Sequence, residues 1–419
     1  MLADFAVPQA LAPMRSEPIL EGRARRAEWT PLELERVAAR LAARGGDALA
    51  SVPLERRIAA WLDVVDALLD PERPERRALV PALVATSRLS PEGLSEALEV
   101  VVGGAGREAL DALVARLPPP APRGLGAVVL AANVPALAVQ TLLPALLLGR
   151  PLLLKSSARE PLAAPALVAA LVAREPALGE AFAAVTWPSG DEALESSALA
   201  RAERIVAYGG AEALADLAAR WGDRLVAHGP RASVALVAGA FDALRVARAI
   251  ARDIALLDQR GCLSVQAVYV AGDARPLAEM LAFALEVEHA RLPPGPIEPE
   301  LAAAVQQLRG EADLAGNLVG QLELAAGSVI WDEVARFRPV PGLRTVRVHP
   351  VDSIETALAA LAPWRGSLQG MAVAGDATTD LAATLVERLG VARVAAAGRL
   401  QHAEAGWASG GIDPLEALG

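Results

Sequence analysis

The only cysteine of the chain, Cys262, stands between a predicted helix (242–257) and a predicted strand (265–270). Because Gly261 precedes it, the backbone can turn sharply there and the thiol can project into a cleft. A thiolate in such a position can attack an acyl carbon if its surroundings lower the thiol pKa. A lone cysteine is more often a small buried core residue. The segment alone therefore makes Cys262 a candidate nucleophile and leaves the packing role open.

Asn133 is the second candidate for chemistry, and it follows a predicted strand (126–130). A side-chain amide N–H aimed at a developing oxyanion stabilises a tetrahedral intermediate. An asparagine just before Pro135 is equally suited to a turn or to a helix N-cap. Both interpretations stay open at this point.

Lys155 is the only lysine among 40 basic residues, and it ends the apolar predicted strand 151–155. The carboxyl ends of strands are where a doubly wound sheet binds its ligands. A compact ammonium is not interchangeable with a guanidinium where space is tight. We therefore predict that Lys155, with Ser156 and Ser157, contacts a ribose or a phosphate of a cofactor. Chance retention of one lysine is the alternative.

A glycine pair gives a weaker signal. Gly209 and Gly210 separate a predicted strand (204–208) from a predicted helix (211–221), so they could admit a pyrophosphate or make an ordinary turn. No spacing of the histidines suits a metal ion, so we predict no metal site and expect each histidine to be a surface or packing residue. The four histidines are His228, His289, His349 and His402.

Short apolar segments alternate with Ala/Leu-rich helical segments after residue 122, which predicts an α/β fold with parallel, doubly wound sheets. The first 120 residues have helical, amphipathic patterns, for example at 31–44 (with Thr30 as a possible cap), 54–69 and 91–101. The proline-rich run 117–122 is typical of a linker. The strands predicted in the first alternation are 126–130, 151–155, 183–187, 204–208 and 224–228.

Composition excludes several classes of protein. A net charge of −10 argues against nucleic acid or an anionic membrane as the main partner, and a single cysteine excludes an internal disulfide. The stretch 124–149 has no charged residue, but its prolines and polar side chains favour a buried strand–turn–helix unit over a membrane span. We expect a cytoplasmic protein without a membrane span.

Taken in order, these segments resemble the aldehyde dehydrogenase superfamily. Within it they are similar to the acyl-CoA reductases typified by the fatty acyl reductase of bacterial bioluminescence. Four segments carry the resemblance: Ala132-Asn-Val-Pro135, Leu154-Lys-Ser-Ser157, Tyr208-Gly-Gly210 and Asp258-Gln-Arg-Gly-Cys262. The resemblance implies two doubly wound parallel-sheet domains and a helical N-terminal region. The expected limits are 1–236 for the helical region with the dinucleotide-binding domain and 237–395 for the catalytic domain. Residues 396–419 are expected to return to the cofactor domain or to an oligomer interface.

The resemblance also implies roles. Cys262 is the expected nucleophile and Asn133 the expected oxyanion donor, while Lys155, Ser156, Ser157, Gly209 and Gly210 are the expected cofactor-binding residues. The implied substrate is an acyl-CoA thioester, reduced to an aldehyde through an acyl-cysteine. NADPH is the favoured cofactor, with NADH as the alternative, and a homo-oligomer is expected by analogy.

One departure bears on the direction of the reaction. Oxidising aldehyde dehydrogenases carry a glutamate that activates water, and the resemblance places Ala227 at that position. Without a base there, hydrolysis of the thioester should be slow, which favours reduction. Three alternatives remain: an ordinary aldehyde dehydrogenase, an acyl-phosphate reductase, and a non-catalytic subunit that keeps the fold.

Overall fold

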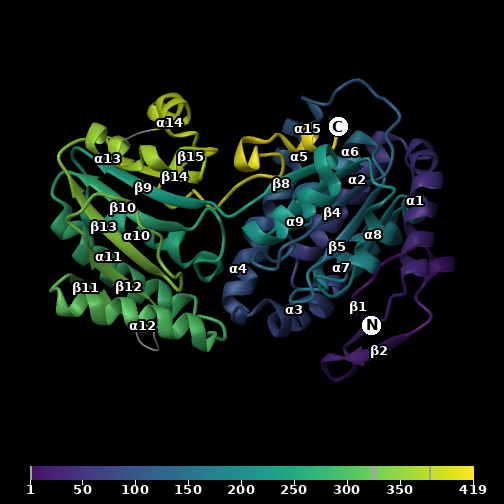
Figure 1. Cartoon of the computed structure of the whole chain (residues 1–419), viewed down its shortest axis with the longest axis horizontal. Helices are drawn as coiled ribbons and strands as arrows, with labels where there is room; N and C mark the ends of the chain where they lie inside the picture. Colours follow the sequence, from purple (N-terminus) through teal and green to yellow (C-terminus); the bar gives the residue numbers. More distant parts are fainter. Residues whose placement is uncertain (1, 323–326, 377–378) are drawn as a thin grey trace.

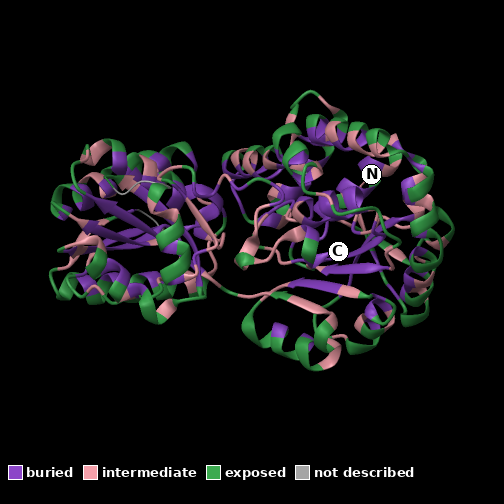
Figure 2. Ribbon diagram, turned by 90° about the horizontal axis from the view of Figure 1, so that it is seen from above, coloured by how far each residue is buried: buried purple, intermediate pink, exposed green. Residues whose placement is uncertain are grey.

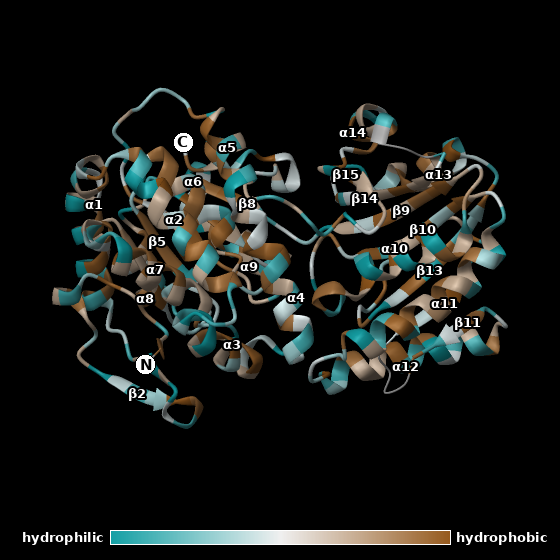
Figure 3. Ribbon diagram, turned by 180° about the vertical axis from the view of Figure 1, so that it is seen from behind, coloured by the Kyte–Doolittle hydropathy of each residue, from teal (hydrophilic) through white to brown (hydrophobic). Residues whose placement is uncertain are grey.

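Two large sheets, each covered by helices on both faces, form the framework of the chain (Figure 1). The computed structural model describes residues 2–322, 327–376 and 379–419. Most strands of both sheets are buried along most of their length, whereas the outer helices expose one face (Figure 2). Hydropathy follows the same division, with hydrophobic strands inside and hydrophilic helix surfaces outside (Figure 3).

The first large sheet has the strand order β6-β5-β4-β7-β8, and all of its pairs are parallel. Every one of these strands agrees with a predicted strand to within one residue at each end, because a parallel strand covered on both faces appears in the sequence as a continuous apolar run. The strands are β4 (Gly126–Val129), β5 (Leu152–Ser156), β6 (Phe182–Thr186), β7 (Arg204–Tyr208) and β8 (Leu225–His228).

The second large sheet has the order β11-β12-β13-β10-β9-β14-β15. Its pairs are parallel except β11 with β12 at one edge. The expected architecture of two doubly wound parallel sheets is thus confirmed, with one antiparallel edge strand added. The strands are β9 (Ala232–Ala238), β10 (Val265–Ala271), β11 (Leu318–Gln321), β12 (Ser328–Trp331), β13 (Thr345–Val351), β14 (Leu368–Gly375) and β15 (Arg393–Ala396).

The N-terminal region differs from the prediction of helices alone. A small sheet precedes them, formed by β1 (Leu2–Ala3), β2 (Ser16–Ile19) and β3 (Ala24–Ala27). An isolated bridge joins Ala6 to Ala184 of β6. These strands are short, β2 and β3 carry charged residues, and pairing with distant backbone stabilises them, so hydrophobic patterns did not indicate them.

The helices agree with the predictions in most places. α2, α4 and α9 have the predicted bounds, and Thr30 caps α1 by accepting a hydrogen bond from the Glu33 N–H. α1 continues past the predicted end at residue 44 because Gly45 lets it pack closely on Pro151. The helices are α1 (Pro31–Ser51), α2 (Leu54–Leu69), α3 (Pro74–Ser87), α4 (Pro91–Val101), α5 (Arg107–Val114), α6 (Val139–Leu148), α7 (Ala163–Arg174), α8 (Glu192–Leu199), α9 (Ala211–Trp221), α10 (Ala243–Ala255), α11 (Ala274–Arg291), α12 (Pro299–Leu314), α13 (Ile354–Leu361), α14 (Ala382–Leu389) and α15 (Pro414–Ala417).

The chain passes between the large sheets twice. It crosses first between β8 and β9, and because β9 pairs with β10 and β14, residue 236 lies inside the second sheet. We therefore propose a domain limit just before Ala232 instead of after residue 236. The second crossing follows β15, after which α15 packs against α6 and Leu418 is fully buried there.

The uncharged stretch 124–149 forms β4, a loop and α6. Pro144 lies inside α6, and the neighbouring strands and helices cover both elements. None of the helices in the described part of the chain has the length and hydropathy that crossing a bilayer requires.

Candidate active site

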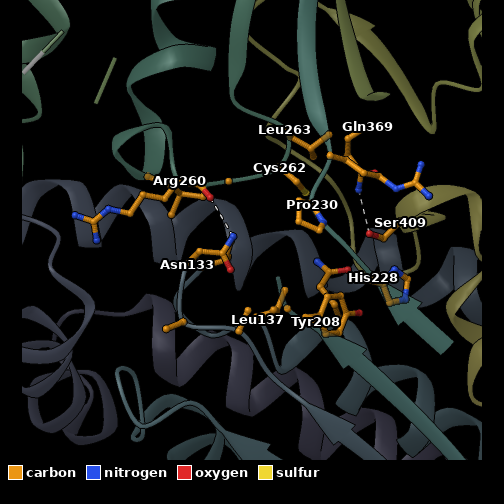
Figure 4. Close-up of a pocket in the computed structure, with 18 of the residues that line it drawn as sticks. Asn133, Leu137, Tyr208, His228, Pro230, Arg260, Cys262, Leu263, Gln369 and Ser409 are labelled. Atoms are coloured by element: carbon orange, nitrogen blue, oxygen red, sulfur yellow. Dashed lines mark hydrogen bonds between the residues drawn. The ribbon is translucent and has the colours of Figure 1, made fainter. Parts of the chain in front are cut away.

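A cavity of about 750 Å³ lies between the two large sheets. It brings together Cys262, Asn133, Ser157, Gly209 and Gly210, all of which line it. In Figure 4 the loop of Cys262 descends from the second sheet, and Asn133 faces it from the loop after β4. Five of the seven predicted site residues therefore share one cavity, while the other two are not part of its lining.

The loop that carries Cys262 begins with an unusual turn. Leu257, Asp258 and Gln259 all have positive φ, a left-handed conformation that costs non-glycine residues energy. The Gln259 side chain compensates by donating to the carbonyls of Val265 and Thr345 and by accepting from the Thr345 N–H. A second turn follows at the predicted place, where the Gly261 carbonyl accepts from the Ser264 N–H at 3.0 Å.

Gly261 makes this turn without a left-handed backbone conformation. A Cβ at this position would lie 3.2 Å from the Gln401 Oε1 and 3.3 Å from a Leu257 methyl carbon. The glycine therefore serves close packing of the loop.

A buried ion pair holds the same turn. An Asp258 carboxylate oxygen accepts from Arg344 at 2.6 Å, and its other oxygen accepts from the Gly295 N–H at 3.0 Å. The two charged side chains are 4% and 2% exposed. Removing one partner would leave a buried charge without compensation.

We expect Asp258→Ala to lower the free energy of unfolding by about 3–5 kcal/mol, because the Arg344 guanidinium stays buried without its carboxylate. Urea denaturation measures this change. The double variant Asp258→Leu with Arg344→Met carries no buried charge there and should be more stable than Asp258→Ala. A single variant as stable as the parent would contradict a stabilising role for the pair.

Cys262 itself is half-buried, and its carbonyl accepts from the Ser233 hydroxyl at 2.7 Å. Burial raises the pKa of the thiol. The neighbouring Gln369 side chain, the loop's own N–H groups and the charge of Arg231 act in the opposite direction. The nucleophile therefore depends on nearby donors to reach its thiolate form.

Asn133 lies in the loop between β4 and α6. Its Nδ2 donates to the carbonyl of Arg260 at 3.0 Å, two residues before the cysteine. This bond, drawn in Figure 4, holds the amide against the nucleophile loop. An amide N–H fixed here is suited to donate to an oxyanion that forms on the carbon attacked by Cys262.

Two aromatic side chains form a wall of the cavity that the sequence did not predict. Tyr208 and His228 are opposite each other in the β7–β8 pair, and their rings stack with centroids 4.6 Å apart. His228 was expected at the surface or in packing, but the structure places it in the cavity lining. The sequence did offer one indication that His228 lies in the cavity, namely its position at the end of a predicted strand, next to Ala227.

Burial, reinforced by the charge of Arg231, lowers the pKa of His228 to about 4. Burial also raises the pKa of Tyr208 above its ordinary range, and the nearby Cys262 adds to this rise. Both rings are therefore uncharged near neutral pH.

This shift in His228 predicts a pH dependence of stability. Below about pH 6.5, His228 takes up a proton in the unfolded chain, whereas in the folded chain it does so only near pH 4. The free energy of unfolding should therefore decrease as the pH is lowered from 6.5 to 4. Above it, His228 should contribute no pH dependence. In thermal unfolding, His228→Asn should lose less stability than the parent as the pH falls from 6.5 to 4. If the stability of the two proteins changed with pH in the same way, His228 would not be the cause.

The predicted cofactor residues cluster at the ends of β5 and β7. The Lys155 Nζ lies 5.7 Å from the centre of the Trp187 ring, and burial lowers the pKa of the ammonium. The Ser156 hydroxyl is buried and has no hydrogen-bond partner among the described residues. Gly210 caps α9, and the space where its Cβ would project is open.

These residues fit a dinucleotide. An unpartnered hydroxyl and an ammonium can bind ribose or phosphate oxygens. The free N–H groups at the start of α9 can stabilise a pyrophosphate. Lys155 and Ser156 are outside the cavity lining, whereas Ser157, Gly209 and Gly210 belong to it.

Carboxylates are scarce in the cavity. Glu298 is the one acidic residue among the described residues that line it, and it forms an ion pair with Arg88. Ala227 is exposed on β8 and does not line the cavity. No unpaired carboxylate in this described lining is thus available to activate water.

The chain is similar to known proteins in sequence and in fold. A family model described as acyl-CoA reductase (LuxC) matches residues 61–419. The chain belongs to this family. The long-chain acyl-protein thioester reductase of Aliivibrio fischeri is 26% identical over 314 residues, which cover 71% of this chain and 63% of that protein. The long-chain acyl-protein thioester reductase 2 of Photobacterium leiognathi is 26% identical over 313 residues, with the same two coverages of 71% and 63%. The chain thus spans about 63% of the length of these curated relatives.

Solved structures place the LuxC-family chain in the aldehyde dehydrogenase fold. An oxidoreductase from Marinobacter aquaeolei has a TM-score of 0.71 at 15% identity, covering 91% of this chain and 86% of that one. Aldehyde dehydrogenase C of Pseudomonas syringae, solved with NAD+ and octanal, also has a TM-score of 0.71, at 17% identity and with 93% and 88% coverage. The expected aldehyde dehydrogenase-like fold is confirmed.

Proposed function

We propose that this chain reduces an acyl thioester to an aldehyde, with Cys262 as the nucleophile and NADPH as the hydride donor. One observation carries the proposal. Cys262 and Asn133, whose amide is bonded to the loop of the cysteine, line one cavity whose described lining holds no acid other than the Arg88-paired Glu298. Such a site can form an acyl-cysteine but offers no carboxylate base for its hydrolysis.

In the first half-reaction, the Cys262 thiolate attacks the thioester carbonyl and a new carbon–sulfur bond forms. The oxyanion receives hydrogen bonds from the Asn133 amide and from the Cys262 backbone N–H. When the intermediate collapses, the original carbon–sulfur bond breaks. The carrier leaves as a thiolate, which takes a proton from water.

In the second half-reaction, the same donors stabilise the oxyanion that reduction of the acyl-cysteine produces. A bound nicotinamide supplies the hydride for this reduction. Collapse of the resulting thiohemiacetal breaks the Cys262 carbon–sulfur bond, releases the aldehyde and restores the thiolate. Lys155, Ser156 and Ser157 with the Gly209–Gly210 turn would hold the cofactor. Lys155 favours NADPH because an ammonium near the ribose can pair with a 2′-phosphate.

The apolar part of the cavity supports a hydrocarbon acyl group. Val101, Val134, Leu137, Trp407 and Ile412 line it. We propose acyl-CoA as the acyl donor, in line with the family description. An acyl-protein thioester is the second candidate, because the named relatives are acyl-protein thioester reductases.

The test incubates the purified full chain with acyl-CoAs of increasing chain length, with an acyl-protein thioester and with an acyl phosphate. Each is tested with NADPH and with NADH, and aldehyde is measured. We expect aldehyde from a thioester donor and faster turnover with NADPH. Comparison of the two thioester donors identifies the carrier.

Three results would replace the proposal. Steady oxidation of an aldehyde to the free acid with NAD+, without an added thiol, would indicate an ordinary aldehyde dehydrogenase. Aldehyde from acyl phosphate alone would indicate an acyl-phosphate reductase. A chain that binds no nicotinamide and forms no acyl adduct would be a non-catalytic subunit.

A further inference from the structure

Gln369 is a buried polar residue in the active-site cavity with no role in the reaction described so far. It lies on β14, is 2% exposed and lines the cavity. Its Nε2 donates to the Ser409 hydroxyl at 3.1 Å. Its Oε1 is buried without a partner among the described residues.

β14 runs directly alongside the nucleophile loop. Gly370 on β14 is opposite Ser233 on β9, and the Ser233 hydroxyl donates to the Cys262 carbonyl at 2.7 Å. A Cβ at Gly370 would lie 2.9 Å from a Leu263 methyl carbon. The strand and the loop are thus in contact, and the side chains of Gln369 and Cys262 line the same part of the cavity (Figure 4).

We propose that Gln369 is a positioning residue that donates an amide N–H to the Cys262 thiolate, and that Ser409 fixes the orientation of this amide. The inference rests on the proposed role of Cys262 as nucleophile.

The orientation follows from the hydrogen-bonding capacity of the amide. Nε2 carries two hydrogens, one of which faces the Ser409 oxygen while the other can face the sulfur. A flipped amide would direct its oxygen at a thiolate, which repels it. In Figure 4 the Gln369 amide is directed toward Ser409, on the same side of the cavity as Cys262.

The thiol needs such a donor because burial disfavours its charged form. Among the described residues, the charged and titratable groups that act on it are Arg231, which favours the thiolate, and Tyr208, which is uncharged near neutral pH. Gln369 adds a donor without a charge. Through Ser409, the C-terminal segment then takes part in setting the state of the nucleophile.

The test measures the rate at which iodoacetamide alkylates the full-length chain as a function of pH, without substrate or cofactor. Because the chain has one cysteine, the mass of the adduct reports Cys262 alone. The midpoint of the profile gives the apparent thiol pKa, and the plateau at high pH gives the accessibility of the sulfur. Gln369→Met keeps the length of the side chain and removes the amide.

We expect Gln369→Met to raise the midpoint by about one unit and to lower the alkylation rate at neutral pH about tenfold, with an unchanged plateau. Ser409→Ala should shift the midpoint in the same direction by less. The matched control is Gln266→Met, the same substitution in the same cavity. The Gln266 side chain accepts from the Val340 N–H and should leave the midpoint unchanged.

Unchanged midpoints in both Gln369→Met and Ser409→Ala would overturn the inference, as would a change in the plateau alone. If Gln369→Met fails to fold, Ser409→Ala decides the question. If the midpoints of the variants shift as expected but the parent forms no acyl adduct with a thioester, the proposed function is wrong and the role of Gln369 stands.

Discussion

The Cys262→Ala variant should form no acyl-enzyme and should reduce thioesters at least about 10⁴-fold more slowly than the parent, because the nucleophile that splits the reaction into two steps is gone. Intact-protein mass spectrometry after incubation with acyl-CoA alone measures the adduct. Turnover with NADPH measures the rate of reduction.

Cys262→Ser is the matched control, since it keeps the size of the side chain and replaces the thiol with a weaker nucleophile. It should retain the fold and lose most of the activity. An acyl adduct on Cys262→Ala, which has no cysteine left, or undiminished aldehyde formation would disprove the proposed mechanism.

The second large effect is expected at Asn133. Asn133→Ala removes the oxyanion donor from the side chain and should lower kcat by about 10²–10³, with a much smaller change in KM. Acyl transfer to Cys262 should slow as well, since the same donor acts in both half-reactions. Single-turnover measurements without and with NADPH separate the rate of acyl transfer from the rate of reduction.

Asn317 provides a matched control, because the chain has no other asparagine and this one lies between α12 and β11, outside the cavity lining. Asn317→Ala should keep the parent rate. An equal loss in both variants, or a loss at Asn133 confined to KM, would count against oxyanion stabilisation.

Much of the fold could be predicted because its strands are buried on both faces. Runs such as the three leucines at 152–154 of β5 are apolar throughout, so their hydrophobicity indicates a parallel core strand. The small sheet at Leu2–Ala27 could not be predicted. Its charged β2 and β3 hold each other by backbone pairing, which hydrophobic patterns do not record.

The candidate site was predictable where one segment carries both the residue and its context. Cys262, Asn133 and the Gly209–Gly210 turn each follow or precede a strong apolar element. Gln369 and Ser409 could not be found in this way, because their proposed role depends on the Cys262 loop, which is far from both in the sequence. The resemblance indicated the order of the motifs, but it did not indicate that Gln369 and Ser409 lie near Cys262.

The two crossings of the chain, before β9 and after β15, have a mechanical consequence. A body attached to another at two points turns most easily about the line that joins them, and other rotations stretch one of the connections. Any opening of the crevice should therefore be a one-axis swing. Arg231, in the first connection, packs against Gly410, in the second, at about 3.2 Å from where a Cβ of that glycine would stand. The two connections are thus in contact, and Arg231 and Gly410 both line the cavity that holds Cys262.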